Sequence, residues 1–161
     1  VFDVLGALGA ASVDARLVLG GPLVDARDER LLRDGLARAG EAAEYLGACQ
    51  RDDVLDRCDV FLFPTRYPDE SWGLVAWEAM LHGLPLLAYR AGCLTAEAVG
   101  QAGVVLAPDT DFAGAASPVL ERWAADEPAR LAAGRAASTV AARTREDGRS
   151  GLAELARAIA A

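Results

Sequence analysis

Short apolar runs alternate along this chain with segments whose apolar residues recur at helical spacing. The runs are typical of buried strands, because most are apolar throughout and are bounded by glycine, proline or charged residues. Strands are expected at residues 15–21, 44–47, 59–65, 84–90 and 103–108. Helices are expected at residues 25–40, 51–58, 71–82 and 95–100, followed by an alanine-rich helical region from about residue 111.

The order of these elements predicts the fold class. Buried strands separated by helices indicate a parallel sheet that is covered on both faces. We therefore expect one α/β domain over residues 1–161, a doubly wound parallel sheet of Rossmann-like type with C-terminal helices. Gly40 is expected to end the first long helix, and Thr95 is expected to cap a later one. The polar stretch 144–151 is expected to separate two C-terminal helices.

Composition supports an aliphatic globular interior and restricts the partners. The 161 residues suit one domain, and 53% of them are hydrophobic while 6% are aromatic. The formal net charge is −8, all 16 basic residues are arginine, and the arginines form no cluster. This balance argues against nucleic acid or an anionic membrane surface as the main partner.

The cysteines and the start of the chain indicate a compartment and a domain boundary. Cys49, Cys58 and Cys93 are odd in number and lack metal-binding spacing, which favours a reduced, cytoplasmic setting. No signal peptide and no apolar run of bilayer-spanning length is visible. The chain opens without methionine, so we expect it to be a piece of a longer protein.

Residues 69–88, DESWGLVAWEAMLHGLPLLA, contain the most informative pattern. The predicted helix is apolar on nearly all sides, yet it carries Glu78, and Glu70 lies just before it. Burying an unpartnered carboxylate costs roughly several kcal/mol, so Glu78 has to be exposed, paired or bound to a ligand. Helical side chains lean toward the helix N-terminus, which would aim Glu78 back at the helix mouth beside Glu70.

The start of this helix has the properties of an anion site. Unpaired backbone N–H groups from about Ser71 to Leu74 and the helix dipole attract negative charge, and Gly73 has no side chain to block a close approach. A diphosphate at this point, with sugar hydroxyls bound to the two acids, describes a nucleotide sugar. The residues alone also allow a structural alternative, in which Glu78 pairs with an arginine and Glu70 favours the helix N-terminus.

The stretch PTRYPDESWGLVAWEAMLHGLPLLA resembles the signature of the retaining, two-domain (GT-B) glycosyltransferases of family 4. Its two glutamates have the spacing of that signature, and Trp72 stands where phenylalanine is usual. LVLGGP, EYLGACQRDDVLDRCDVFLFPT and AGCLTAEAVGQAGVVLAP resemble further segments of the family, so nearly all of residues 1–125 is similar in style to the donor-binding C-terminal domain. The other matches within the signature are Gly73, Leu74, Ala79, Met80, Gly83 and Pro85.

The resemblance implies a hexosyltransferase of carbohydrate biosynthesis that moves a sugar from a nucleotide sugar to an acceptor hydroxyl. It implies that Glu70 holds hydroxyls of the donor sugar beside the reacting carbon and that Glu78 binds the ribose. No metal or other cofactor is expected, because the helix dipole and basic residues handle the leaving diphosphate. The remaining implied contacts are the backbone of Ser71, Trp72, Gly73 and Leu74 at the diphosphate, Gly21 near the nucleotide, and Leu46 and Arg51 beside the base.

Three departures from the family pattern restrict what this chain can do alone. The family's Arg and Lys pair falls upstream of Val1, the glycine loop reads Gly92-Cys93, and the acceptor-binding N-terminal domain is absent. We expect the isolated chain to be inactive, with the missing domain as its partner and a membrane-associated acceptor left open. The alternatives are a non-catalytic α/β interaction module and one half of a nucleotide-sugar epimerase.

Two further features are better explained by structure than by chemistry. Residues 109–111, DTD, resemble the metal-binding acidic triplet of the other glycosyltransferase fold, but their place before a helix favours Asp111 as an N-cap. His82 is the single histidine, and at a helix end it caps the helix or complements its dipole.

Overall fold

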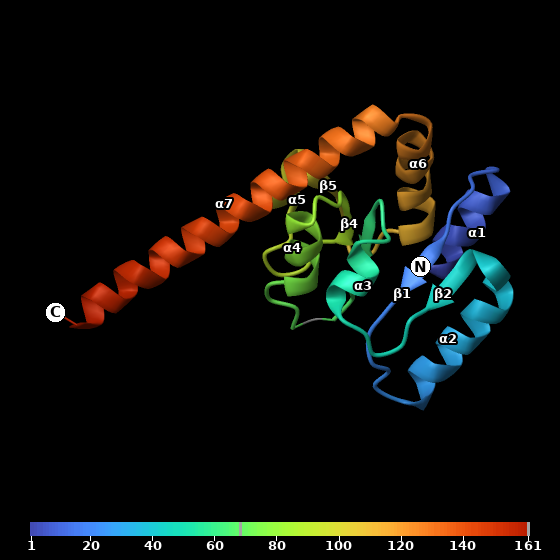
Figure 1. Cartoon of the computed structure of the whole chain (residues 1–161), viewed down its shortest axis with the longest axis horizontal. Coiled ribbons are helices and arrows are strands. Elements are labelled where there is room, and N and C mark those ends of the chain that lie inside the picture. The colour runs from blue at the N-terminus through green and yellow to red at the C-terminus, as the bar shows by residue number, and fades with distance from the viewer. Residues whose placement is uncertain (68, 161) are drawn as a thin grey trace.

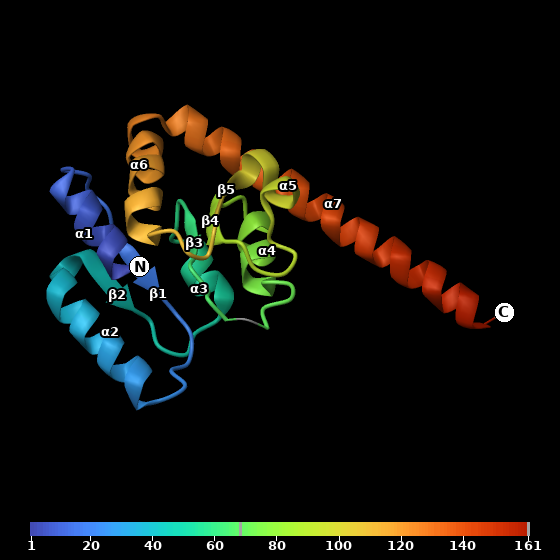
Figure 2. The same cartoon turned by 180° about the vertical axis from the view of Figure 1, so that it is seen from behind.

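Five short parallel strands form the centre of the protein, with helices on both sides of them (Figure 1, Figure 2). The computed structural model describes residues 1–67 and 69–160, and for residues 154–160 it describes the helical backbone alone. The strands are β1 (Leu17–Leu19), β2 (Ala43–Tyr45), β3 (Phe61–Phe63), β4 (Leu86–Tyr89) and β5 (Gly103–Leu106). The helices are α1 (Phe2–Ala10), α2 (Ala26–Ala39), α3 (Arg51–Leu55), α4 (Leu74–Leu81), α5 (Ala96–Val99), α6 (Phe112–Ala125) and α7 (Glu127–Ala160), with 3-10 turns η1 (Gly40–Ala42) and η2 (Gly100–Ala102).

The strands form two separate sheets. β1 pairs in parallel with β2, with Val18 opposite Glu44, and β3, β4 and β5 pair in parallel in that order, with Leu62 opposite Leu87. The predicted α/β class, with parallel strands and helices on both faces, is confirmed. Among the described residues, however, no strand joins β1 to β3, so the sheet is divided at this point.

The core is centred on β4, which is buried along its whole length. Leu87 and Tyr89 face one way and pack with α1 and α6. Leu86 and Ala88 face the other way and pack with α4, α5 and α7. Because successive side chains of a strand point to opposite faces, a strand buried on both faces has to be apolar throughout, as this one is.

Helix ends follow the signals in the sequence. The Asp25 carboxylate accepts hydrogen bonds from two N–H groups at the start of α2, and Gly40 ends that helix with φ +56°. The predicted caps are also confirmed, because Thr95 accepts from the Ala98 N–H and Asp111 accepts from the Gly114 N–H. None of the helices in the described part of the chain combines the length and the apolar character needed to cross a membrane.

The predicted break at residues 144–151 is wrong, because α7 runs through them without interruption (Figure 1). The break between the last two helices lies at Asp126 instead. Its carboxylate accepts from the Ala129 N–H, and Pro128 occupies the first turn, where a missing N–H costs nothing. Charged arginine-rich sequence is compatible with an exposed helix, so polarity alone does not mark a break.

Candidate functional site

The candidate site lies at the carboxyl ends of the strands, where the strand order reverses. The chain passes outward from β1 to β2 and then, in the opposite direction, from β3 to β4 and β5. Ligands of such sheets bind in the crevice at this reversal. The segments that follow the strands here are Gly20–Gly21, Leu46–Gly47, 64–70 and 90–93.

The two glycines after β1 serve different purposes. A Cβ on Gly20 would lie 2.4 Å from Cγ2 of Val54, so this position is closed by α3. Gly21 has φ +121°, and its N–H donates to the Gly47 carbonyl at 2.8 Å. The Tyr45 hydroxyl donates to the Gly21 carbonyl at 2.6 Å, which fixes the turn. Sequence reasoning missed this tyrosine, because a lone residue at a strand end gives no signal.

Helix α4 begins at Leu74, three residues later than predicted. Its N-cap, Gly73, has φ +57°, and a Cβ there would lie 2.7 Å from Cδ1 of Leu94 and 3.3 Å from the Phe63 ring. The side chain that glycine lacks would therefore point into the core. This corrects the idea that Gly73 clears a path for a ligand, since its role is to permit a left-handed conformation and close packing.

Glu70 is held at the start of α4. Its Oε1 accepts a hydrogen bond from the Gly73 N–H at 2.9 Å. The carboxylate therefore lies at the positive end of the helix dipole, as its position in the sequence predicts. It also uses one of the N–H groups that the sequence offered to a diphosphate, so a ligand would meet the remaining N–H groups.

Glu78 lies one turn after Leu74 and is not buried. Its side chain is 40% exposed, and Oε1 is 2.7 Å from Nη1 of Arg51 in α3. Hydrogen bonds to Asp52 and to Glu78 raise the pKa of Arg51, so the guanidinium stays charged. The structure thus brings together two predicted site residues that are far apart in the sequence. The pairing also matches the structural alternative for this glutamate.

The strength of this ion pair decides whether Glu78 remains available to a ligand. Ion pairs between exposed side chains contribute about 0.2–1 kcal/mol. Such a pair orients the Glu78 carboxylate but is too weak to prevent hydroxyl groups of a ligand from binding to it. Both the structural and the ligand-binding interpretation are therefore compatible with the contact.

The loop after β4 packs directly on the loop that precedes α4. Gly92 has φ +49°, and a Cβ there would lie 2.1 Å from the Ser71 carbonyl oxygen and 2.4 Å from that of Glu70. The Cys93 N–H donates to the same Ser71 oxygen at 2.8 Å. The sequence showed Gly92 only as part of the glycine loop, and the structure adds that Gly92 makes the close contact that positions Glu70.

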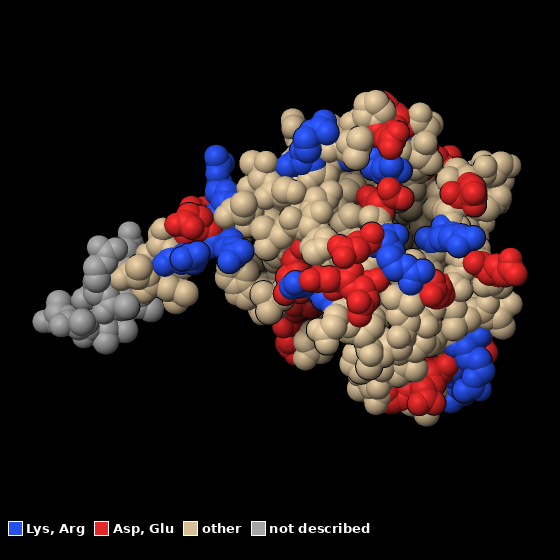
Figure 3. Space-filling view, viewed as in Figure 1, with Lys and Arg blue, Asp and Glu red and all other residues tan. Residues whose placement is uncertain are grey.

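The other predicted residues of the helix start are open to solvent. Residues Trp72 and Leu74 are 51% and 70% exposed. Acidic side chains gather around α3 and α4 on this face, with arginine among them (Figure 3). A diphosphate would meet this negative charge, so it needs cations in addition to the helix dipole and Arg51.

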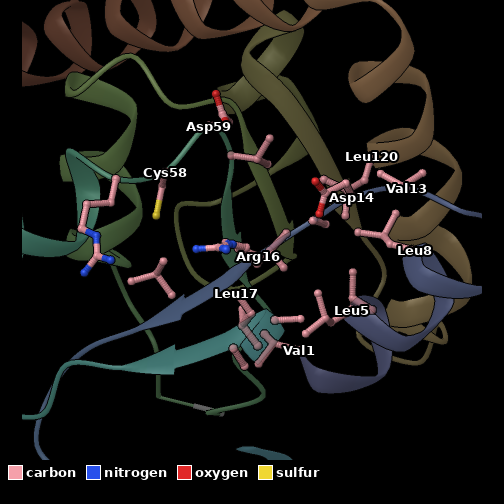
Figure 4. Close-up of a pocket in the computed structure, with 18 of the residues that line it drawn as sticks. Val1, Leu5, Leu8, Val13, Asp14, Arg16, Leu17, Cys58, Asp59 and Leu120 are labelled. Carbon is pink, nitrogen blue, oxygen red and sulfur yellow. The ribbon is translucent and has the colours of Figure 1, made fainter. Parts of the chain in front are cut away.

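A large cavity lies away from Glu70 and Glu78. It has a volume of about 610 Å³ and is located between β1 and β3, beneath α1 and α6 (Figure 4). We assign the candidate site to the strand ends, because the polar groups gather there and the cavity lining is mainly apolar.

The Asp111 cap and the position of His82 at a helix end are as predicted, whereas the pairing of the His82 side chain with Asp56 was not predicted. The Asp111 carboxylate caps α6, and His82 ends α4 with its Nε2 2.9 Å from Oδ1 of Asp56. Among the side chains that the structure describes, in residues 1–67 and 69–153, no three of the types that bind metals come together.

Comparison with known proteins gives a consistent result. The family model described as "Glycosyl transferases group 1" matches residues 3–122. D-inositol 3-phosphate glycosyltransferase of Stackebrandtia nassauensis is 36% identical over 129 residues, which cover 73% of this chain and 28% of that protein.

Two solved structures share the fold at low sequence identity. HepE of Anabaena, crystallised with UDP and glucose, superposes with a TM-score of 0.69 at 22% identity, over 88% of this chain and 39% of that one. Sucrose-phosphate synthase of Thermosynechococcus elongatus gives a TM-score of 0.66 at 24% identity, over 95% of this chain and 42% of that one. This chain therefore spans less than half the length of each of these relatives.

Proposed function

This chain belongs to the glycosyl transferases group 1 family, and we propose that it is the donor-binding part of a retaining two-domain glycosyltransferase. The observation that carries the proposal is the position of Glu70. Its carboxylate is fixed at the start of α4, at the reversal of strand order, with Glu78 one turn further along the same helix. Two oriented carboxylates around a helix start suit a ligand with a diphosphate between two groups of hydroxyls.

In this proposal each group has a distinct task. Glu70 accepts hydrogen bonds from hydroxyls of the donor sugar next to the carbon that reacts, and Glu78 with Arg51 holds the nucleoside. The free N–H groups at the start of α4 stabilise the charge that develops on the departing diphosphate. The relative crystallised with UDP and glucose supports a nucleotide sugar as donor and makes UDP-sugars the first to test.

The rest of the enzyme belongs to the proposal as well. Relatives are more than twice as long as this chain, which leaves room for a second domain that binds the acceptor. An acidic face around α3 and α4 disfavours a diphosphate, so further cations would come from outside residues 1–161. We expect the isolated chain to bind nucleotide weakly and to transfer no sugar.

Titration calorimetry and activity measurements on the full-length enzyme test the site. In Glu70→Gln the amide oxygen can still accept from the Gly73 N–H, so the helix start is kept while the charge is lost. Hydrogen bonds to charged groups are worth about 1.5–3 kcal/mol, so we expect kcat to fall about 10- to 150-fold. Glu78→Ala should raise Kd for the nucleotide.

Glu44→Ala is the matched control for Glu78→Ala. Glu44 forms an equivalent half-exposed pair with Arg57, with Oε2 2.6 Å from Nη2, but it lies in β2, away from α4. Both variants lose an ion pair, but only Glu78→Ala is expected to lose affinity for the nucleotide. Equal nucleotide affinity in Glu78→Ala and Glu44→Ala, together with full activity of Glu70→Gln, would refute the site.

Cys93 offers a second readout that needs no catalysis. Its side chain is exposed, and its N–H is bonded to Ser71 at the helix mouth. A bound nucleotide should slow its reaction with a thiol reagent. Cys58 is an internal control, because it is half-buried and desolvation raises the pKa of its thiol.

A non-catalytic interaction module is the second candidate. It is favoured by one observation, namely that both glutamates already have protein partners without a ligand. In that case neither nucleotides nor nucleotide sugars would protect Cys93 in the full-length protein, and the glutamate variants would lose stability without any change in ligand binding.

A further inference from the structure

Tyr89 carries a hydroxyl at the end of β4, the strand that is buried along its whole length. The residue is 2% exposed, and its ring packs edge-on against Phe112 in the core between β4 and α6. Phenylalanine would fill nearly the same space without a polar group, and a buried hydroxyl is costly unless it is hydrogen-bonded. The partners of this hydroxyl therefore indicate what the tyrosine contributes.

The hydroxyl joins two loops at the carboxyl ends of the strands. It donates to the Thr110 carbonyl at 2.7 Å, in the loop between β5 and α6. It accepts from Nη2 of Arg66 at 2.8 Å, in the loop between β3 and α4. We call these three groups the Tyr89 anchor. It ties two surface loops to a side chain that the core holds in place.

The arginine is bound to this anchor in two ways. Besides its hydrogen bond, the guanidinium lies over the Tyr89 ring, with Cζ 5.0 Å from the ring centroid. Hydrogen bonds from a charged donor are stronger than neutral ones, and the face of an aromatic ring attracts a cation. None of the ion pairs in the described part of the chain includes Arg66, so no carboxylate competes for its guanidinium.

Backbone contacts continue from the anchored arginine to the start of α4. Tyr67 follows Arg66 directly, and its carbonyl accepts from the Glu70 N–H at 3.3 Å. The Glu70 carboxylate in turn accepts from the Gly73 N–H at 2.9 Å. The buried hydroxyl is thus connected to Glu70 through a short series of contacts.

Glu70 is therefore held from both sides along the chain. Gly92 packs on the carbonyl oxygens of Glu70 and Ser71, which fixes the chain at and after the glutamate. The Tyr89 anchor fixes the chain before it. A carboxylate held in this way keeps its direction without a ligand, as a group that has to be preorganised requires.

We infer that Arg66 and Tyr89 are positioning residues, which hold the Glu70 carboxylate in the direction needed for sugar transfer. The task of Glu70 rests on the function proposed above, whereas the hold on its loop follows from the contacts alone. Glu78 is oriented separately by Arg51. Loss of the anchor should therefore lower turnover and leave nucleotide affinity nearly unchanged.

Hydrogen exchange in the full-length gene product tests the hold on the loop. Tyr89→Phe removes the hydroxyl but keeps the ring, and the Gly73 amide should then exchange at least about fivefold faster, because Glu70 accepts from it for less of the time. Ser117→Ala is the matched control. Ser117 is also buried, and it donates to the Ala113 carbonyl at 2.8 Å within α6, so its loss should leave Gly73 unchanged.

Transfer activity of the same variants gives the second readout. Tyr89→Phe and Arg66→Ala should each lower kcat about 3- to 10-fold, with Kd for the nucleotide changed less than about twofold. Arg66→Lys should recover most of kcat, because an ammonium can donate to the same hydroxyl. In a Glu70→Gln background Tyr89→Phe should cause little further loss, because the charged group that it positions is gone.

Two results would overturn the inference. One is unchanged Gly73 exchange in Tyr89→Phe, and this measurement decides alone if no donor supports turnover. The other is a loss of kcat that is as large in the Glu70→Gln background as in the wild type, since Tyr89 would then support the fold in general. Faster Gly73 exchange with full activity of both Tyr89→Phe and Glu70→Gln would instead refute the proposed role of Glu70, while the hold on the loop would stand.

Discussion

At Gly92 the lack of a side chain is a packing requirement between two loops that are distant in the sequence. The nearest atoms are backbone carbonyl oxygens of Glu70 and Ser71, which cannot rotate away as a side chain could. The same contact sets the position of Glu70 at the start of α4. A single residue in one loop thereby fixes a candidate catalytic residue in another.

Gly92→Ala should therefore destabilise the protein more than its backbone angle alone explains. Gly100→Ala is the control. Gly100 also has a positive φ, +55° compared with +49° for Gly92, but no atom lies within 4 Å of its Cβ position. We expect the control to cost about 1–3 kcal/mol, because φ +55° with ψ −126° is a conformation that residues with a Cβ rarely adopt, and Gly92→Ala to cost about 1–3 kcal/mol more from overpacking. Urea denaturation measures both, and equal midpoints would show that the loops separate freely.

Helices in this protein are positioned by small residues where they cross. α7 passes over α4, and Gly134 of α7 would have its Cβ 2.3 Å from the carbonyl oxygen of Gly83 at the end of α4. Ala137 and Ala141 continue the buried side of α7, and both are almost completely inaccessible. Alanine-rich sequence thus serves close helix packing at one end of α7, while its other end extends beyond the body (Figure 2).

Two glycine substitutions in α7 should have opposite effects. Glycine to alanine in an exposed helix interior stabilises by about 0.5–1 kcal/mol, so Gly148→Ala, with nothing within 4 Å, should raise Tm. Gly134→Ala gains the same propensity but pushes α7 away from α4, for a net loss of about 1–2 kcal/mol. Thermal unfolding monitored by circular dichroism gives the direction of the change in Tm for each substitution. Stabilisation by both substitutions would mean that α7 does not pack closely on α4.

On the scale of the whole molecule the two sheets differ in how well they are buried. β4 is inaccessible along its length, and α4 contributes four buried residues. β1 and β2 contain no fully buried residue, and α2 contributes Gly35 alone. The residues of the first sheet are therefore held by fewer apolar contacts than those of the second.

We expect this difference to appear as two levels of stability in the 161-residue chain. Amides of α2 and β2 should exchange through partial opening, at least tenfold faster than those of α4 and β4, because local unfolding follows local burial. Hydrogen exchange by mass spectrometry resolves the two regions. Uniform exchange in all four elements would indicate a single cooperative unit and contradict this expectation.

The sequence by itself determined the class of fold and several helix ends. Apolar runs, Gly40, Thr95 and Asp111 act within a few residues of themselves, so their consequences can be derived without knowing the rest of the chain. The same is true of Glu70, whose carboxylate binds an N–H three residues away.

Tertiary structure decided what depends on residues that are distant in the chain. It decided that Glu78 pairs with Arg51 and that Gly92 contacts Ser71. It also decided that Gly73 faces the core and that α7 continues through residues 144–151. The division of the sheet at β1 and β3 was decided in the same way. Packing between separate elements fixes these features, and sequence patterns record which faces are apolar but not which faces meet.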